Sequence, residues 1–240
     1  YCIENLTLGA RELHYIEDQL LERGIHIGNA MVIMHAKSGF LAKAAEVFDK
    51  LPFQDIISWN SVITACGSYG YSEDALEYFE QMTLVGMSPD VITFVGVLKA
   101  CGDIGATRTG QKIHADIERR GFLQSDLISS AIVSMYAKCG LISKAQEVLE
   151  GLPLRDVVSW NALISGYTHQ DQFYEALKCF EEIEHEGLFP DEITFICMLK
   201  CCGKTRAIEK GKWIHDEIMK SNQGLLDKHT HVGNALVDMY

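Results

Sequence analysis

Side-chain amides and carboxylates recur at a fixed spacing along this chain of 240 residues. Asn60 lies 30 residues before Asp90, and Asn161 lies 30 residues before Asp191. An amide offers N–H donors and an acceptor, whereas a carboxylate only accepts, so both residue types can form directed hydrogen bonds with a polar ligand. Taken singly, an Asn or Asp near a helix start is more usually a cap or a turn residue.

The two pairs belong to a long internal repeat. Trp59 and Trp160 each stand between a serine and an asparagine, 101 residues apart. The same offset relates Pro52 to Pro153, Asp55 to Asp156, Asn60 to Asn161, Pro89 to Pro190, Asp90 to Asp191, Cys101 to Cys202, and His114 to His215. Within it, steps of 35, 35 and 31 residues lead from Asp55 to Asp90, Ser125 and Asp156. Each long period therefore contains three similar units of unequal length.

Each unit has the pattern of two helices separated by glycines. In the unit 56–90, a first helix around Trp59 reaches the break at Gly70, and Ser72 is a candidate N-cap for the second. The second helix carries an apolar stripe of Ala75, Leu76, Phe79 and Met82. One such hairpin cannot bury its apolar face alone, whereas stacked neighbours can. We therefore predict an all-α solenoid of helical hairpins, with the two tryptophans in its core.

The composition restricts the possible functions. Hydrophobic residues make up 48% and charged residues 22% of the chain, and no apolar run approaches the roughly 20 residues of a membrane helix. The net charge of −12 disfavours non-specific binding to phosphate. The eight cysteines include no C-x-x-C pair, so we expect reduced, mostly buried thiols, no metal site and no cofactor. His114 and His215 are expected to pack between helices.

Several phrases carry a family resemblance. They are DVVSWNALISGY, EALKCFEEIEHEGLFPDEITF, VLKACGDIGATRTGQKIHADI, SMYAKCGLISKAQEVLEGLPLRD and VGNALVDMY. The chain strongly resembles plant-type pentatricopeptide repeat proteins of the PLS subclass, in which standard, long and short motifs alternate. The resemblance implies a right-handed superhelix and the following motifs: partial long 1–24, short 25–55, standard 56–90, long 91–125, short 126–156, standard 157–191, long with an insertion 192–229, and partial short 230–240. Because both ends fall inside motifs, we expect a piece of a longer protein.

The resemblance also implies recognition of single-stranded RNA, about one base per repeat. The base-selecting residues would be the fifth and last of each standard and short motif, namely Asn29 with Asp55, Asn60 with Asp90, Ser130 with Asp156, Asn161 with Asp191, and Asn234. The second residues would lie between bases, namely His26, Ile57, Leu127, Val158 and His231. Lys37, Lys138 and His169 match positions that approach phosphate. Under the family's rules, Asn with Asp selects uracil before cytosine, Ser with Asp selects guanine, and the amino end lies toward the 5′ end.

Three classes of function compete. The first is the RNA-binding module, as part of a factor for C-to-U editing or RNA processing in the mitochondrion or chloroplast. Such a factor would be a monomer and could act with accessory editing proteins. The second is a protein-binding scaffold of the tetratricopeptide kind, whose 34-residue pattern is missing here. The third is an enzyme, but a deaminase centre needs an H-x-E together with a later P-C-x-x-C. That combination is missing, so we expect no catalysis by this segment, although a deaminase-like domain could follow it.

Overall fold

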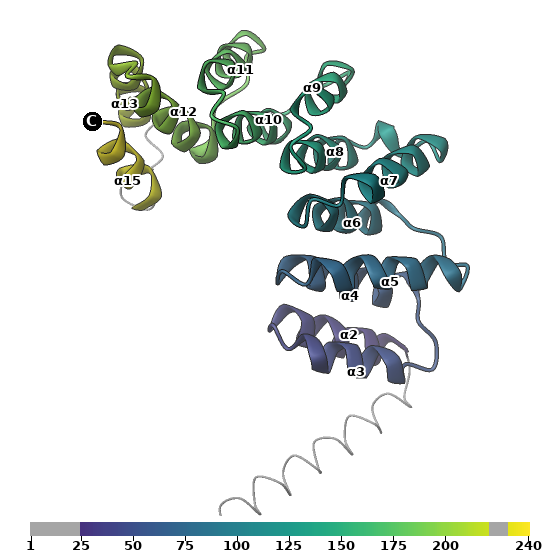
Figure 1. The fold of residues 1–240 in the computed structure, drawn as a ribbon. Helices are drawn as coiled ribbons and strands as arrows, with labels where there is room; N and C mark the ends of the chain where they lie inside the picture. Colours follow the sequence, from purple (N-terminus) through teal and green to yellow (C-terminus); the bar gives the residue numbers. More distant parts are fainter. Residues whose placement is uncertain (1–24, 221–229) are drawn as a thin grey trace, which may run out of the picture. The chain divides into compact units, whose positions relative to one another are not determined.

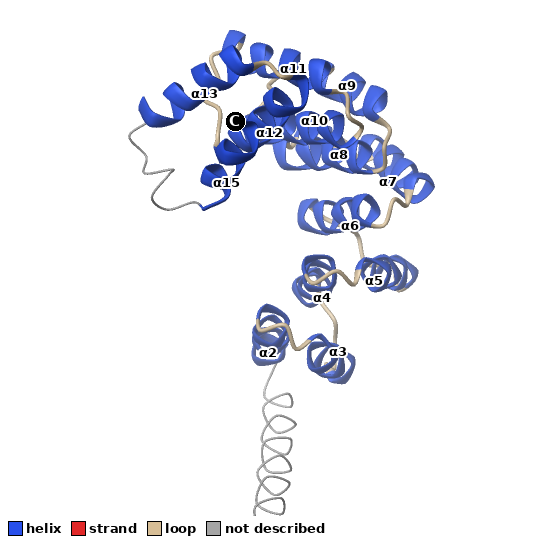
Figure 2. Cartoon of the chain, turned by 60° about the vertical axis from the view of Figure 1, so that its left-hand side comes forward, coloured by secondary structure: helices blue, strands red, loops and turns tan. Residues whose placement is uncertain are grey.

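A computed structural model describes residues 25–220 and 230–240 of the chain (Figure 1). The expected motif 1–24 and the insertion at 221–229 lie outside the described residues. The helices are α2 (Ile25–Lys37), α3 (Leu41–Lys50), α4 (Ile56–Ser68), α5 (Ser72–Leu84), α6 (Val91–Asp103), α7 (Thr107–Arg119), α8 (Asp126–Lys138), α9 (Ile142–Glu150), α10 (Val157–His169), α11 (Phe173–His185), α12 (Glu192–Thr205), α13 (Ile208–Lys220) and α15 (Thr230–Met239), with a short 3-10 turn at Phe122–Gln124. Across these described ranges the chain forms helices and loops without a strand (Figure 2).

The helices pack as hairpins within two compact units, 1–100 and 101–240. In the first unit, α2 packs with α3, α4 packs with α5, and α2 also lies against α4. In the second unit, the pairs are α8 with α9, α10 with α11 and α12 with α13. The first helices of these pairs also touch in turn, since α10 contacts both α8 and α12, and α12 contacts α15. The prediction of an all-α solenoid is confirmed, while the right-handed superhelical twist stays a prediction.

The first helices begin at residues 25, 56, 91, 126, 157, 192 and 230, which are the first residues of the expected motifs. Asp55, Asp156 and Asp191 are N-caps, and each carboxylate accepts the backbone N–H three residues on, at 2.8–3.0 Å. Side-chain caps are absent from the second helices α3, α5, α7, α9 and α11. The prediction for Ser72 is wrong, because Tyr71 is the N-cap residue and Ser72 is the first residue of α5. The Ser72 hydroxyl is buried and makes no hydrogen bond within residues 25–220 and 230–240.

The core forms where the faces of neighbouring helices meet. Trp59 and Trp160 are buried, as predicted, and the Trp59 ring lies 4.7 Å from the ring of Phe48. In the stripe of α5, Ala75 and Met82 are fully buried, while Leu76 and Phe79 are half-buried. This apolar packing fixes the first helices, from which the polar pairs project.

The turn after each first helix needs one residue in the left-handed backbone region. In four of these turns the residue is a glycine. The φ angles are 79° at Gly39, 84° at Gly70, 66° at Gly105 and 79° at Gly140. At the equivalent place of the last two described hairpins stand Asp171 and Arg206, each with φ of 56°. A residue with a Cβ pays about 1–2 kcal/mol in this region, and aspartate somewhat less.

We expect Arg206→Gly to raise the free energy of unfolding by about 1 kcal/mol, because relief of the left-handed strain exceeds the entropy that glycine adds to the unfolded chain. Asp171→Gly should give a smaller gain. Urea unfolding followed by circular dichroism measures both. Gly140→Ala is the matched control and should lose about 1 kcal/mol. A loss of stability in Arg206→Gly would contradict this account of the turn.

Candidate functional site

The fifth residue of one motif and the last residue of the same motif lie side by side. Asn60 Nδ2 donates to both carboxylate oxygens of Asp90, at 3.0 and 3.1 Å. Asn29 Nδ2 donates likewise to Asp55, at 2.9 and 3.0 Å. Asn161 Nδ2 donates to Asp191 Oδ1 at 2.8 Å. The Asn and Asp residues that the family resemblance pairs are therefore hydrogen-bonded to each other in the structure.

The helical hairpin brings the two members of each pair together from opposite ends of one motif. The asparagine stands one turn into a first helix, and the aspartate directly precedes the next first helix. Asp90, for example, accepts the N–H of Thr93 at 2.9 Å in the first turn of α6, while Asn60 projects from α4. The cap fixes the carboxylate, and the carboxylate in turn fixes the amide, so the side chain of Asn60 is held in one orientation by the fold itself.

A third residue completes two of the pairs. Thr93 Oγ1 lies 2.6 Å from Asn60 Oδ1, and Thr194 Oγ1 lies 2.6 Å from Asn161 Oδ1. The sequence analysis missed both threonines. Their shared position three residues after an aspartate, repeated at the 101-residue offset, was the available signal. At Asp191 this forms a capping box, because Thr194 Oγ1 also accepts the backbone N–H of Asp191 at 3.2 Å.

The serine-containing motif keeps the same arrangement with a smaller side chain. Ser130 Oγ lies 3.3 and 3.2 Å from the two carboxylate oxygens of Asp156 and 2.9 Å from Ser159 Oγ. Asn234 differs from the other fifth residues because it is exposed. The position equivalent to Asp55, which follows Asn29 by 26 residues, would come after Tyr240.

The Asn60–Asp90 pair opens onto a groove of about 790 Å³ in the first unit. Its lining comes from α2, α4 and the start of α6, and includes Lys37, Ile57 and Ile92. The two isoleucines are 50% and 58% exposed, and they flank the polar pair with apolar surface. A planar, polar-edged group fits such a combination of directed hydrogen bonds and apolar walls.

The second residue of each described standard and short motif is exposed to solvent. His26, Ile57, Leu127, Val158 and His231 are all exposed, which agrees with a surface role for these predicted residues. Ile92 and Ile193, the second residues of the long motifs, are equally exposed, and the sequence analysis did not include them. The apolar positions therefore continue through the long motifs within each unit.

The candidate phosphate contacts are less uniform. Lys37 and His169 are exposed at the ends of their helices. Lys138 instead forms an ion pair with Asp103, with Nζ 2.6 Å from Oδ1, which reduces its availability for phosphate. A second hollow, of about 710 Å³, holds His231 and Asn234 together with Lys200 and Lys204. The sequence analysis missed these two exposed lysines.

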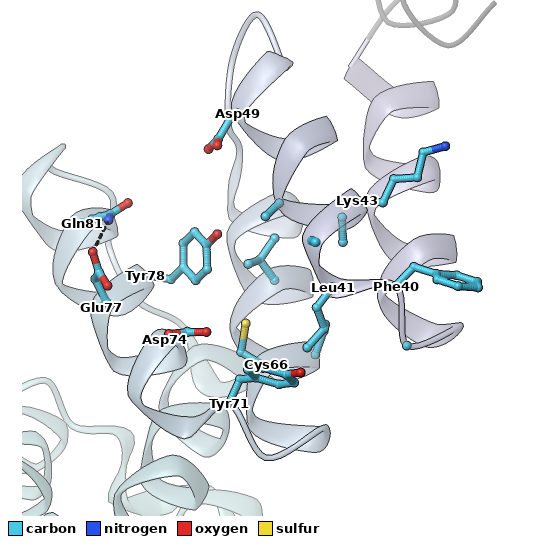
Figure 3. Close-up of a pocket in the computed structure, with 16 residues that line it drawn as sticks. Phe40, Leu41, Lys43, Asp49, Cys66, Tyr71, Asp74, Glu77, Tyr78 and Gln81 are labelled. Carbon is cyan, nitrogen blue, oxygen red and sulfur yellow. Dashed lines mark hydrogen bonds between the residues drawn. The ribbon is translucent and has the colours of Figure 1, made fainter. Parts of the chain in front are cut away.

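A further hollow of about 730 Å³ lies against α3 and α5, and none of the Asn–Asp pairs lines it (Figure 3). Burial and the nearby carboxylates of Asp49 and Asp74 raise the pKa of Tyr78 in its wall to about 12. At the position equivalent to Cys66, 101 residues later, stands Tyr167, whose hydroxyl donates to Gln146 Oε1 at 2.7 Å. The small Cys66 side chain thus leaves open a space that a tyrosine occupies in the second copy.

The chemistry of the described residues favours binding over catalysis. Burial raises the pKa of Cys66 to about 11 and that of Cys101 and Cys179 to about 12, so these thiols stay protonated at neutral pH and are poor nucleophiles. The described cysteines are free thiols. Burial lowers the pKa of His114, which contacts the Tyr136 hydroxyl at 2.9 Å, in agreement with the predicted packing role.

His215 likewise packs against Tyr240, with Nδ1 3.1 Å from the hydroxyl. His215 and Glu217 form an H-x-E triplet. A deaminase zinc site also needs the cysteine ligands of a P-C-x-x-C element, which this triplet does not provide. Among residues 25–220 and 230–240, no three His, Cys, Asp or Glu side chains gather as a metal site would require. In the same ranges no helix is long and apolar enough to cross a membrane.

The stacked hairpins and their regularly placed polar pairs define a helical-repeat protein that carries its candidate binding groups on the first helices. Family models for this class match the chain directly: the PPR repeat family at 54–103 and 155–204, and the PPR repeat at 29–54 and 128–157. The chain belongs to the pentatricopeptide repeat family.

Curated relatives from Arabidopsis thaliana agree with this assignment. A chloroplastic pentatricopeptide repeat-containing protein is 34% identical over 100% of this chain and 45% of its own length. A mitochondrial one is 32% identical over 98% of this chain and 37% of its own length. The chain therefore spans less than half the length of these relatives.

Solved structures show the same fold. The pentatricopeptide repeat protein PPR10 from maize is 22% identical and matches with a TM-score of 0.65 over 87% of this chain and 30% of its own. PPR10 in complex with an 18-nucleotide psaJ RNA element is 20% identical and matches with a TM-score of 0.68, over 88% and 31% of the two chains.

Proposed function

We propose that this chain is a sequence-specific, single-stranded RNA-binding array in which each standard and short motif selects one base. The observation that carries the proposal is the Asn–Asp pair, pre-organised by an N-cap and open to an apolar-walled groove. The RNA-bound structure of PPR10, a protein of the same fold, supports it.

The remaining hydrogen-bonding capacity of Asn60 suits a pyrimidine. One N–H of its amide goes to Asp90 and one lone pair of Oδ1 goes to Thr93, which leaves one donor and one acceptor. Uracil and cytosine each present a donor beside an acceptor. A purine would push its larger ring toward Ile57 and Ile92, which flank the groove.

We further propose a role in organellar RNA metabolism. The steps of 35, 35 and 31 residues support the PLS subclass, and with it a role in organellar C-to-U editing or RNA processing. The chloroplastic and mitochondrial names of the relatives support an organelle as the location. Under this proposal the repeats deliver the RNA to an editing activity that resides in a further domain or an accessory protein, and the array binds as a monomer.

The base pattern is the direct test. Motifs 25–55, 56–90, 91–125, 126–156, 157–191 and 192–229 should select pyrimidine, pyrimidine, any base, guanine, pyrimidine and any base, read from the 5′ end. A fluorescence-anisotropy titration compares this RNA with RNAs in which the guanine or one pyrimidine is exchanged. Each exchange should weaken binding roughly 5- to 150-fold, which corresponds to a loss of about 1–3 kcal/mol.

One variant links the pattern to a residue. Asn60→Thr should shift only the second position of the pattern toward guanine under the family's rule. Glu80→Gln, on the exposed side of α5, is the control and should leave every preference unchanged. Equal binding of matched and exchanged RNAs, together with an unchanged Asn60→Thr, would refute base selection and favour the scaffold alternative.

A further inference from the structure

Three Asn–Asp pairs that look alike in the sequence differ in one contact. Asn60 Oδ1 and Asn161 Oδ1 each meet a threonine hydroxyl at 2.6 Å. Asn29 Oδ1 is buried, and no donor within the described part of the chain reaches it. The equivalent third residue there is Ser58, whose hydroxyl donates instead to the backbone oxygen of Asp55 at 2.8 Å.

The hydroxyl proton of the threonine must point at the amide. Thr93 Oγ1 lies 2.6 Å from Asn60 Oδ1 and 3.0 Å from Asp90 Oδ1, yet it has a single proton. Two oxygens at 2.6 Å without a proton between them repel each other. The carboxylate already accepts Asn60 Nδ2 and the N–H of Thr93, whereas no other donor among the described residues reaches Asn60 Oδ1. The same argument holds at Thr194.

This bond restrains the amide at both ends. Asp90 holds the nitrogen and Thr93 holds the oxygen, so rotation of the Asn60 amide about its terminal torsion breaks two hydrogen bonds at once. In Asn29 only the nitrogen is held, by Asp55. A recognition group held at two points loses less freedom when it binds and tolerates fewer alternative geometries.

We propose that Thr93 and Thr194 are positioning residues that set how strongly Asn60 and Asn161 discriminate between bases, and that Asn29 discriminates less strongly because it lacks this bond. The inference rests on the proposed function, since it grades a base selection that the Asn–Asp pairs themselves provide. It assigns to the third residue of one motif an effect on the base selected by the motif before it.

The experiment measures base discrimination position by position, as the ratio of the affinities for RNAs that differ at one base. Thr194→Val removes the hydroxyl at nearly constant volume and should reduce discrimination at the motif 157–191 about fivefold, the worth of one net hydrogen bond. Thr194→Ser keeps the hydroxyl and should restore it. Ser58→Thr introduces the missing group and should raise discrimination at the motif 25–55 by a similar factor.

A second readout does not need RNA. In the free protein, NMR relaxation of the side-chain NH2 groups should show Asn60 and Asn161 more rigid than Asn29, and Thr194→Val should loosen Asn161 alone. Urea unfolding of each variant separates these effects from a general loss of stability. If Thr194→Val unfolds the chain, two measurements still test the proposal: the base discrimination of Ser58→Thr, and the relative rigidity of the three amides in the wild-type protein.

The outcomes are distinguishable. Unselective binding by the wild-type chain overturns the proposed function, and the inference with it as a statement about RNA. Selective binding with unchanged discrimination in both Thr194→Val and Ser58→Thr overturns the inference alone. Equal rigidity of the three wild-type amides also overturns it. A change that appears in stability but not in discrimination reduces the threonines to structural capping residues.

Discussion

Asp191→Ala should lower the free energy of unfolding by about 2–4 kcal/mol. The change removes the N-cap of α12, which is worth about 0.5–2 kcal/mol. It also removes the carboxylate that accepts both Asn161 Nδ2 and the backbone N–H of Thr194. A buried polar group left unsatisfied costs about 1–3 kcal/mol. Urea unfolding followed by circular dichroism measures the loss, and pyrimidine selection at the motif 157–191 should disappear with it.

Two control variants accompany this one. Ser125 is the N-cap residue of α8, but its side chain makes no cap bond. Ser125→Ala should therefore leave the free energy of unfolding almost unchanged. Asp191→Asn retains an acceptor for the cap and for Asn161, so it should keep most of the stability. If Asp191→Ala were no more harmful than Ser125→Ala, the carboxylate would not be the organising group of the site.

Phe180→Ala should cost about 3–5 kcal/mol, the usual range for truncation of a fully buried aromatic side chain. Phe180 is completely buried in α11, and its ring centroid lies 6.1 Å from that of Trp213 in α13. Removal of the ring leaves a cavity between hairpins of the second unit. The same unfolding measurement applies.

Phe79→Ala is the matched comparison, because Phe79 occupies the equivalent position 101 residues earlier but is only half-buried. Its loss should be clearly smaller. A loss as large as that of Phe180→Ala would show that exposure in the folded chain does not set the cost, and that the two copies differ in some other respect.

The helices and the polar pairs follow from the sequence because both depend on local rules. A glycine break, an apolar stripe and an aspartate before a helix each specify backbone locally, and a solenoid turns a fixed repeat into a fixed spatial neighbour. The pairing of Asn60 with Asp90 could therefore be carried over from the family resemblance, which assigns a role to the fifth and last residues of a motif. The contact of Thr93 with Asn60 was not predicted, because a threonine at the third position of a helix can equally serve as half of a capping box.

Other features of the structure were not predicted for a different reason. The burial of Ser72 depends on which way the first residue of α5 faces, and the spacing of apolar residues does not determine this at a helix end. The pairing of Lys138 with Asp103 depends on side-chain reach between adjacent repeats. Lys200 and Lys204 gain importance only because α15 places His231 and Asn234 beside them. These features arise from tertiary contacts, which a single repeat does not encode.

The hydrogen bonds from Thr93 to Asn60 and from Thr194 to Asn161 cross a motif boundary, and this affects how such arrays can be recombined. An exchange cassette cut between Asp90 and Val91 would carry Asn60 and its carboxylate but leave Thr93 behind in the recipient. A cassette that runs from the fourth residue of one motif through the third residue of the next moves the amide, the carboxylate and the hydroxyl together. Under the proposed function, shuffling at that register transfers a complete base-selecting unit, whereas shuffling at the motif boundary makes each unit depend on its new downstream neighbour.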